Sequence, residues 1–388
     1  MIETQRLGVK KVQHYVFAKH HLVPGYQSGN IVEVAGNLLG LHSARLSTPY
    51  VTLFSRVVNF QTKDLQDSSF VSRDLIRLRC MRKTLHTVPL ALAPIVHQAT
   101  VAFRIADCLR IYRQMEIAPE LVQRIQEEIV AVVSKYPVSS KQLQEHILRG
   151  QARESRQSEF WKKLIRTIIK QLWEEGTLCY LNVSNYWGAE ERVYGYTPNL
   201  YPALYLQMLS SSEAQEKLVY LHIDRFGPVT EADICWWSGL SREVVRKSIH
   251  NLQNHLCMVH LQDCDRTCYM TVEDREAFEK FLPPEGYWLG LLAYEDPSLK
   301  GYFETRSRYI EQNYYHTLFN QIGEARASIV LNGEVIGIWS WDKENHRVVW
   351  QAFVTLNPEI RKVLCQSCIR LEACLNEGTI QHSLFMTM

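Results

Sequence analysis

Apolar residues recur every three or four positions along most of the first 280 residues, and this spacing predicts amphipathic helices. The helical runs come in three successive groups, and a pair of shorter strand-like runs follows each group. We expect helices over residues 8–22, 29–41, 49–60, 94–115, 118–136, 141–148, 160–176, 212–223 and 242–252. We expect the paired strands within 76–90, 177–198 and 258–273.

The third group has the most complete local signals. Thr230, with Asp233 three residues later, has the spacing of a capping box in which Asp replaces the usual Glu. Gly239 predicts a tight turn, and Ser241 is a candidate N-cap for the helix over 242–252. A short helix, a glycine turn, a second helix and a hairpin form the pattern of a winged helix-turn-helix. Such units mostly bind duplex DNA, and some bind proteins instead.

The periodicity changes near Phe281, where strand-like runs replace helical ones. Asn332-Gly333 between two alternating runs is a strong hairpin signal, and a last helix is expected over 358–376. We therefore predict an α+β protein, mainly α, with three tandem winged helix-turn-helix units followed by a C-terminal β-barrel-like domain or curved sheet closed by a helix. The predicted domains are 1–117, which holds the candidate catalytic loop, 118–200, 201–280 and 281–388.

Composition describes a globular protein without a membrane span. The chain has 388 residues, 46% hydrophobic and 22% charged, which predicts two to four domains. Its charged start lacks the apolar segment of a signal peptide, so we expect a cytoplasmic protein, associated with the nucleoid if bacterial, with reduced cysteines. Cys365, Cys368 and Cys374 are three thiols without a fourth ligand at metal-site spacing, so we expect no metal and no cofactor.

The net charge of +2 does not indicate a nucleic-acid partner, but one segment is strongly basic. Residues 73–86 contain five basic residues and one acidic residue, namely Arg73, Arg77, Arg79, Arg82 and Lys83 against Asp74. Such a cluster suits phosphate neutralisation. The alternative is an ordinary solvated basic face.

Four stretches of the chain resemble one known family. They are LLGLHSARLSTPYVTLFSRV, MRKTLHTVP, FGPVTEADICWWSGL and VLNGEVIGIWSW, which together span residues 38–341. They are similar to the motifs of winged-helix DNA glycosylases of the AlkZ and YcaQ (AlkX) type. The resemblance implies a C-shaped row of winged helices around double-stranded DNA. It also implies metal-free hydrolysis of the N-glycosidic bond of alkylated purines and, in some members, unhooking of interstrand crosslinks. We expect a monomer.

The first motif departs from the family at the site of the chemistry. Where the family carries Gln-x-Gln or Gln-x-Asp, this chain aligns His42, Ser43 and Ala44. His42 and Ser43 are the candidate catalytic residues, because a neutral histidine can orient or deprotonate a water and a hydroxyl can hold it. His42 has an alternative role in capping a helix C-terminus. Ala44 can do no chemistry, so a non-catalytic DNA-binding protein remains the second hypothesis and a winged-helix transcription regulator the third.

Candidate DNA contacts lie in the same motifs and in the last domain. Other polar and aromatic residues of these motifs are expected to have structural roles. We expect Ser47 or Thr48 to be a helix N-cap followed by Pro49, and Trp236, Trp237 and Trp339 to be core residues. The candidate DNA contacts are Arg45, Arg56, Arg79, Arg82, Lys83, Thr84, His86, Arg306 and Arg308.

Overall fold

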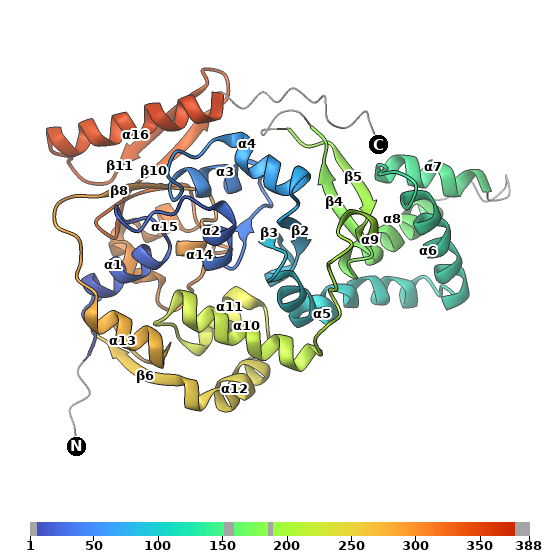
Figure 1. Ribbon diagram of the computed structural model, residues 1–388, viewed down its shortest axis with the longest axis horizontal. Coiled ribbons are helices and arrows are strands. Elements are labelled where there is room, and N and C mark those ends of the chain that lie inside the picture. The colour runs from blue at the N-terminus through green and yellow to red at the C-terminus, as the bar shows by residue number, and fades with distance from the viewer. Residues whose placement is uncertain (1–5, 151–158, 185–188, 377–388) are drawn as a thin grey trace.

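Helices dominate the protein, and its strands form small separate sheets (Figure 1). The computed structural model describes residues 6–150, 159–184 and 189–376. The predicted class, α+β and mainly α, is confirmed, whereas the division into three winged-helix units and the four domain boundaries stay predictions. No helix within the described ranges is both long and apolar enough to cross a bilayer.

The N-terminal part contains short helices around a three-stranded sheet with the order β1-β3-β2. The sheet is antiparallel, and β1 and β2 both pair with the central strand β3. The elements are α1 (Val9–Lys19), α2 (Ile31–Asn37), β1 (Leu41–His42), α3 (Ser47–Phe54), α4 (Thr62–Gln66), β2 (Leu75–Arg79), β3 (Leu85–Pro89) and the long α5 (Ala93–Gln114).

The next group forms the right-hand edge of the molecule in Figure 1. Its helices pack on each other through regularly spaced apolar residues such as Val122, Ile125, Ile129 and Val133, all buried. The elements are α6 (Pro119–Val133), α7 (Ser140–Gly150), α8 (Glu159–Glu174), the antiparallel hairpin β4 (Leu178–Asn182) and β5 (Arg192–Tyr196), and α9 (Thr197–Leu200).

The third group has the local signals expected of it. Thr230 and Asp233 form a reciprocal capping box, Ser241 caps the following helix, and Gly239 between the helices has a φ of 78°. A Cβ on Gly239 would lie 3.1 Å from the backbone nitrogen of Arg82, so this turn packs closely on the N-terminal part. The elements are α10 (Ser211–Phe226), α11 (Glu231–Ser238), α12 (Arg242–Asn251), the hairpin β6 (Leu256–Leu261) and β7 (Cys264–Thr271), and α13 (Val272–Lys280).

The C-terminal part is an open sheet, so the prediction of a barrel was wrong. Its antiparallel strands follow the order β11-β10-β9-β8, and the edge strands β8 and β11 do not pair with each other. Buried Leu364 and Leu371 of α16 belong to the same core as Trp339 and Val348 of the sheet, so a helix covers the face that closure would have buried. The elements are β8 (Leu289–Leu292), α14 (Pro297–Lys300), α15 (Tyr315–Leu318), β9 (Ser328–Leu331), β10 (Glu334–Asp342), β11 (Arg347–Ala352) and α16 (Pro358–Asn376).

The apolar cores join segments that are far apart in sequence. One core combines α1 and β2 with α10–α13 and residues up to Val335. Another combines α2 and α3 with the C-terminal sheet and α16, and the third belongs to α6–α8 and β4–β5 with the end of α5. The loop after β1 therefore lies where the N-terminal part meets the C-terminal sheet.

Candidate active site and nucleic-acid interface

The first two motifs meet through strand pairing. His42 lies opposite His86, and Leu41 lies opposite Thr87, in the antiparallel pair of β1 and β3. Gly40 precedes the strand with a φ of 106°, and a Cβ there would lie 2.7 Å from a side-chain carbon of Val88. A glycine is thus required for β1 to approach β3. The predicted helix junction at His42 is in fact a short strand.

His42 is 3% exposed, and only one of its two ring nitrogens has a hydrogen-bond partner among the described residues. Its Nε2 lies 3.4 Å from the Nζ of Lys300, and its ring meets the ring of His86 edge to face at 5.4 Å. Its Nδ1 has no hydrogen-bond partner among the described residues. Burial lowers the pKa of His42 well below its usual value, and the positive charges of Lys300, Arg82 and Arg45 lower it further. The imidazole is therefore neutral at physiological pH.

Lys300 and Glu295 complete a buried cluster that the sequence did not reveal. Lys300 is 8% exposed and forms an ion pair with Glu295, which is 2% exposed. Glu295 also accepts a hydrogen bond from the Ala325 backbone N–H at 2.7 Å. Burial and the Arg82 guanidinium lower the pKa of Lys300, whereas the Glu295 carboxylate in contact with it favours the charged form. No local pattern marks these residues, because Lys300 lies 258 positions after His42.

Ser43, the second catalytic candidate, is engaged within the fold. Its hydroxyl lies 2.9 Å from the Leu41 carbonyl oxygen and 2.8 Å from the Thr87 hydroxyl, and the residue is 2% exposed. These contacts tie the loop to β3. They suit a structural hydroxyl better than one that holds a water.

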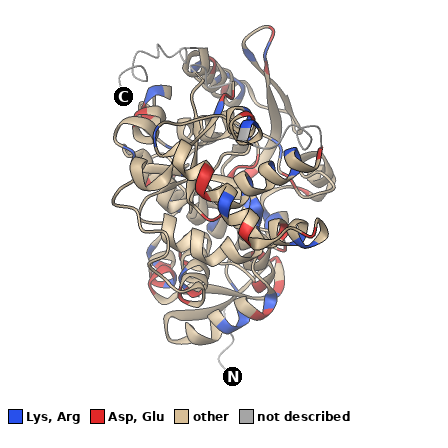
Figure 2. Ribbon diagram, turned by 90° about the vertical axis from the view of Figure 1, so that its right-hand side faces the viewer, with Lys and Arg blue, Asp and Glu red and all other residues tan. Residues whose placement is uncertain are grey.

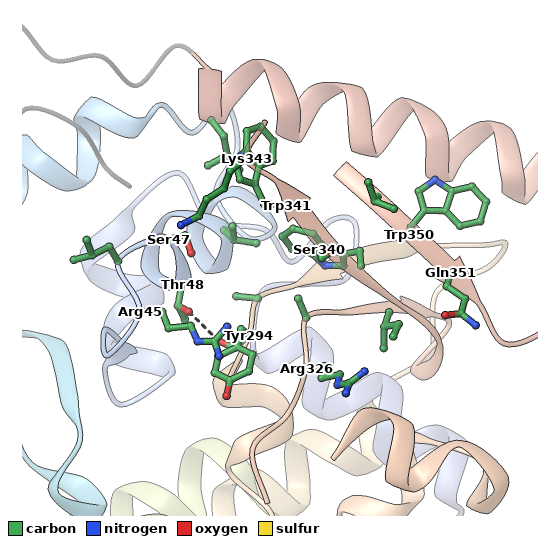
Figure 3. A pocket seen from close by; sticks show the side chains of 18 of the residues that line it. Arg45, Ser47, Thr48, Tyr294, Arg326, Ser340, Trp341, Lys343, Trp350 and Gln351 are labelled. Carbon is green, nitrogen blue, oxygen red and sulfur yellow. Dashed lines mark hydrogen bonds between the residues drawn. The ribbon is translucent and has the colours of Figure 1, made fainter. Parts of the chain in front are cut away.

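Arg45 marks the outer side of the same loop. It is exposed, and its guanidinium lies 3.3 Å above the ring of Tyr294 (Figure 3). Thr48 donates a hydrogen bond to the Tyr294 carbonyl oxygen at 3.0 Å, which joins α3 to the segment after β8. The predicted capping role of Ser47 or Thr48 was wrong, because the helix begins at Ser47 with Leu46 at the N-cap position. Arg45 is thus held in place while its charge stays accessible.

An open cavity of about 1160 Å³ adjoins this loop (Figure 3). Ala44 and Arg45 line it on one side, and residues of β10 and β11 line it on the other. Its aromatic and basic lining includes Trp341, Trp350, Arg326 and Lys343. Aromatic faces combined with cations suit nucleotide rings and phosphates.

A sequence model of the family described as DNA glycosylase AlkZ-like matches residues 35–373. The chain belongs to the AlkZ-like DNA glycosylase family. The fold is also similar to that of Streptomyces sahachiroi DNA glycosylase AlkZ, with a TM-score of 0.77 and 17% identity over 97% of this chain and 98% of that chain. A search of curated proteins gave no match. The resemblance drawn from the four motifs is confirmed.

Some basic residues expected at the DNA surface of this AlkZ-like chain are buried instead. Arg56 is fully buried and pairs with both carboxylate oxygens of Asp296, at 2.6 and 3.0 Å. Arg308 is buried beside Asp263, at 3.7 Å, and donates to the Thr305 carbonyl oxygen. Arg306 is 6% exposed. These three arginines hold the fold together, so we leave them out of the proposed DNA contacts.

The basic segment after β2 is also largely paired. Arg79 contacts Glu174 at 2.6 Å, and Lys83 contacts Asp107 at 2.7 Å. Thr84 donates to the Met81 carbonyl oxygen at 3.0 Å. On the side of the molecule shown in Figure 2, Lys and Arg positions are interspersed with Asp and Glu positions and form no continuous stripe.

Arg82 differs from its neighbours in this segment. Its guanidinium lies 3.6 Å above the ring of Trp236, and it forms no ion pair with any of the described residues. Its backbone has a φ of 52°, a left-handed conformation that is rare for arginine and marks a tight turn. His86 is buried, and burial lowers its pKa to about 3. Among the described residues, Arg45, which is exposed, and Arg82, which is half-buried, are therefore the two cations without an ion pair whose charges act on His42.

Metal ligation has no support in the described ranges, where no group of three His, Cys, Asp or Glu side chains is placed to hold an ion. All ten cysteines are free thiols. Burial raises the pKa of Cys368 to about 12, so this thiol stays protonated.

Proposed function

We propose that this protein is a DNA glycosylase that hydrolyses the N-glycosidic bond of alkylated or crosslinked purines in duplex DNA. Membership of the AlkZ-like family supports glycosylase chemistry. The observation that carries the proposal for this chain is His42, a buried neutral imidazole whose Nδ1 lacks a protein partner. An unpaired buried polar group costs about 1–3 kcal/mol, so a ligand that paired with His42 Nδ1 would be stabilised. The same holds for other buried unpaired atoms such as His222 Nδ1, and what singles out His42 is its place in the first family motif.

The proposed enzyme is monofunctional, binds double-stranded DNA as a monomer and acts in the cytoplasm without metal or cofactor. Three winged-helix units would hold the duplex, and the element order α10, α11, α12 and the β6–β7 hairpin supports this for the third unit. Arg45 and Arg82 are the proposed phosphate contacts closest to the reacting sugar. Each lies over an aromatic ring, which orients its guanidinium without neutralising it.

A second candidate function is DNA binding without catalysis. It is favoured by Ala44, which places a methyl group where the family carries a second polar side chain, and by the engaged hydroxyl of Ser43. Loss of both water-holding groups would leave a protein that still recognises distorted duplexes. A winged-helix transcription regulator is a third reading, which the family match does not favour.

Single-turnover base release separates these candidates. Duplexes that each carry one N7-methylguanine, one neutral alkylated adenine or one interstrand crosslink are incubated with excess protein, and abasic sites are scored by alkaline cleavage. DNA affinity is measured on the same duplexes. Release from at least one duplex, lost in His42→Ala at unchanged affinity, supports the glycosylase. Tight binding without release from any duplex, also after Ala44→Gln, supports the non-catalytic protein.

A further inference from the structure

The reaction proposed for this protein needs negative charge beside the sugar. When the glycosidic bond of an N7-alkylated purine breaks, the base departs neutral and positive charge develops at C1′ of the sugar. Carboxylates stabilise such an oxocarbenium-like state at other glycosidic bonds. Around the loop after β1, however, the charged side chains that act most on His42 are basic, namely Lys300, Arg82 and Arg45. This chemistry therefore requires an acid from another part of the chain.

Two acidic residues, Glu295 and Glu324, lie close to these cations, and the first is already engaged. Glu295 is 2% exposed, and its two carboxylate oxygens contact the Lys300 ammonium and the Ala325 backbone N–H. Glu324 precedes Ala325 in the chain and is partly exposed. Its negative charge acts on both Lys300 and Arg82. A ligand can therefore reach the Glu324 carboxylate without disturbing the buried pair.

A tight turn fixes the position of Glu324. The side-chain oxygen of Asn320 accepts from the backbone N–H groups of Ile322 and Glu324, at 3.2 and 2.9 Å. The Asn320 amide also donates to a carboxylate oxygen of Glu324 at 2.7 Å. Gly323 has a φ of 78°, and a Cβ there would lie 2.8 Å from a ring carbon of Trp236, so the turn packs closely on α11. The carboxylate is thus held in one direction before any ligand binds.

Tyr294 connects this carboxylate to the loop after β1. Its hydroxyl donates a hydrogen bond to Glu324, and its ring lies under the Arg45 guanidinium at 3.3 Å (Figure 3). Its backbone carbonyl oxygen accepts from Thr48, at the start of α3, at 3.0 Å. A carboxylate has about four acceptor positions, so the bonds from Tyr294 and Asn320 leave Glu324 able to accept from a water as well.

Glu324 is charged under physiological conditions. The hydrogen bonds from Tyr294 and Asn320, together with the charges of Lys300 and Arg45, hold the pKa of Glu324 below its usual value. The surroundings of the loop therefore combine accessible positive charge, which suits phosphate, with one fixed negative charge, which suits a cationic sugar.

We propose that Glu324 is a catalytic carboxylate of this site, which stabilises the positive charge at C1′ and accepts a proton from the attacking water. This inference rests on the proposed glycosylase function and assigns a further residue to it. Glu324 lies outside all four stretches that resemble the family, so no motif marks it.

The reaction balances with water as the only other reactant. The C1′–N9 bond of the cationic N7-alkylated nucleotide breaks, and its electron pair neutralises the base. A water oxygen bonds to C1′, and the proton that this water loses passes to the Glu324 carboxylate and then to solvent. The products are the neutral alkylated base, an abasic site and one proton. Because water loses this proton late in its attack on a cationic sugar, a weakly basic carboxylate is sufficient.

The test changes the charge of Glu324 and keeps its shape. Single-turnover base release from an N7-methylguanine duplex and affinity for the same duplex are measured for the wild type and for Glu324→Gln. We expect release to fall about a hundredfold, the scale of a lost preorganised electrostatic group. We expect affinity to stay equal or to rise, because the change removes a negative charge beside the proposed phosphate contacts Arg45 and Arg82. A purely structural residue would lower both quantities together.

Glu324→Asp is the conservative variant, since it keeps the charge on a shorter side chain. Its release should stay at least about tenfold above that of Glu324→Gln, because a proton acceptor and an anion both remain. Glu359→Gln, on the exposed surface of α16, is the matched control and should change neither release nor affinity. Thermal unfolding confirms that each variant is folded.

The outcomes separate this inference from the proposed function. Unchanged release in Glu324→Gln, or an equal loss in folded Glu324→Gln and Glu324→Asp, overturns the catalytic role of Glu324 and leaves a glycosylase in place. A loss of release matched by a loss of affinity overturns it as well, since the residue then serves binding or folding. Absence of release by the wild type from every alkylated or crosslinked duplex overturns the glycosylase itself and the inference with it.

Discussion

Two buried ion clusters in this protein differ in how completely their hydrogen bonds are satisfied. Between α5 and α8, Glu174 accepts from Arg79 at 2.6 Å and from Arg104 at 2.8 Å. Arg104 also donates to the Thr100 hydroxyl, at 3.1 Å, and contacts His97 Nδ1 at 3.2 Å. No polar atom of these five side chains is left buried without a partner.

The cluster of Glu295, Lys300 and His42 is as deeply buried, yet it leaves His42 Nδ1 unpaired. Buried charge alone therefore does not distinguish a site from a structural support. An unpaired donor alone does not do so either, since Arg308, which holds the fold together, also leaves Nη1 and Nη2 buried without a partner among the described residues. The contrast is that the Glu174 cluster is fully paired and the His42 cluster is not. The following predictions test this contrast, beginning with the largest expected effect.

Arg104→Met should destabilise the protein by about 3–5 kcal/mol, because it leaves the Glu174 carboxylate buried with only the partly exposed Arg79. Denaturant unfolding measures the loss. Lys300→Met combined with Glu295→Gln removes a whole pair and should cost much less. A mild effect of Arg104→Met would show that the satisfied cluster is not a structural support.

His42→Ala should lower base release by about a hundredfold, the low end for a positioned proton-donating group, at nearly unchanged DNA affinity. Ser43→Ala is the neighbouring control, since its hydroxyl is engaged by Leu41 and Thr87, and should mainly cost stability. Ala44→Gln rebuilds half of the family's motif and tests whether the second position still matters. Equal release by wild type and His42→Ala would remove His42 from the chemistry.

The cluster of Glu174, Arg104 and His97 should also lower the free energy of unfolding as the pH falls. Burial, together with Arg104, lowers the pKa of His97 to about 3. Between pH 6.5 and 3 the unfolded chain takes up a proton that the folded state refuses, so stability falls as pH falls through this window. From pH 6.5 to 5 this should cost about 2 kcal/mol, at about 1.4 kcal/mol per unit. His97→Gln should shallow the slope by one proton, and unfolding at both pH values measures it. An unchanged slope would contradict the assignment.

Arg82→Ala should weaken duplex binding and lower the dependence of affinity on salt by about one counterion. Lys83→Ala should have at most the same effect, because Lys83 is paired with Asp107. Titrations at several salt concentrations measure both. Unchanged affinity and slope in both variants would exclude this turn from the interface.

The sequence predicted elements where the signal is local. The capping box at Thr230, the turn at Gly239 and the final helix over 358–376 depend on residues within a few positions of each other, and the structure contains all three. The barrel was not predictable in this way. Whether β8 pairs with β11 depends on contacts across some 60 residues and on α16, which competes for the same face.

The residues of the candidate site also differ in whether a local sequence signal indicates them. The first motif directed attention to His42, and strand pairing placed it beside His86. Lys300 and Glu295 could not be found, because nothing near them in sequence indicates that they contact His42. Arg56 was predicted as a DNA contact because nothing near it in sequence indicates that it pairs with Asp296, which lies 240 positions away. A single sequence shows which residues carry charge, but not which of them are already paired.

The first helix of the chain is completed by residues that are made much later. Leu7 bridges to Leu261 of β6, Lys19 pairs with Asp274 of α13 at 2.7 Å, and Phe17 packs against Tyr309. On a ribosome, α1 would therefore emerge long before its partners and would expose its apolar side while some 250 further residues are added. Native packing of α1 must then wait until α13 and the residues that follow it have been made, whereas the core of α6–α8 depends on residues that are close in sequence.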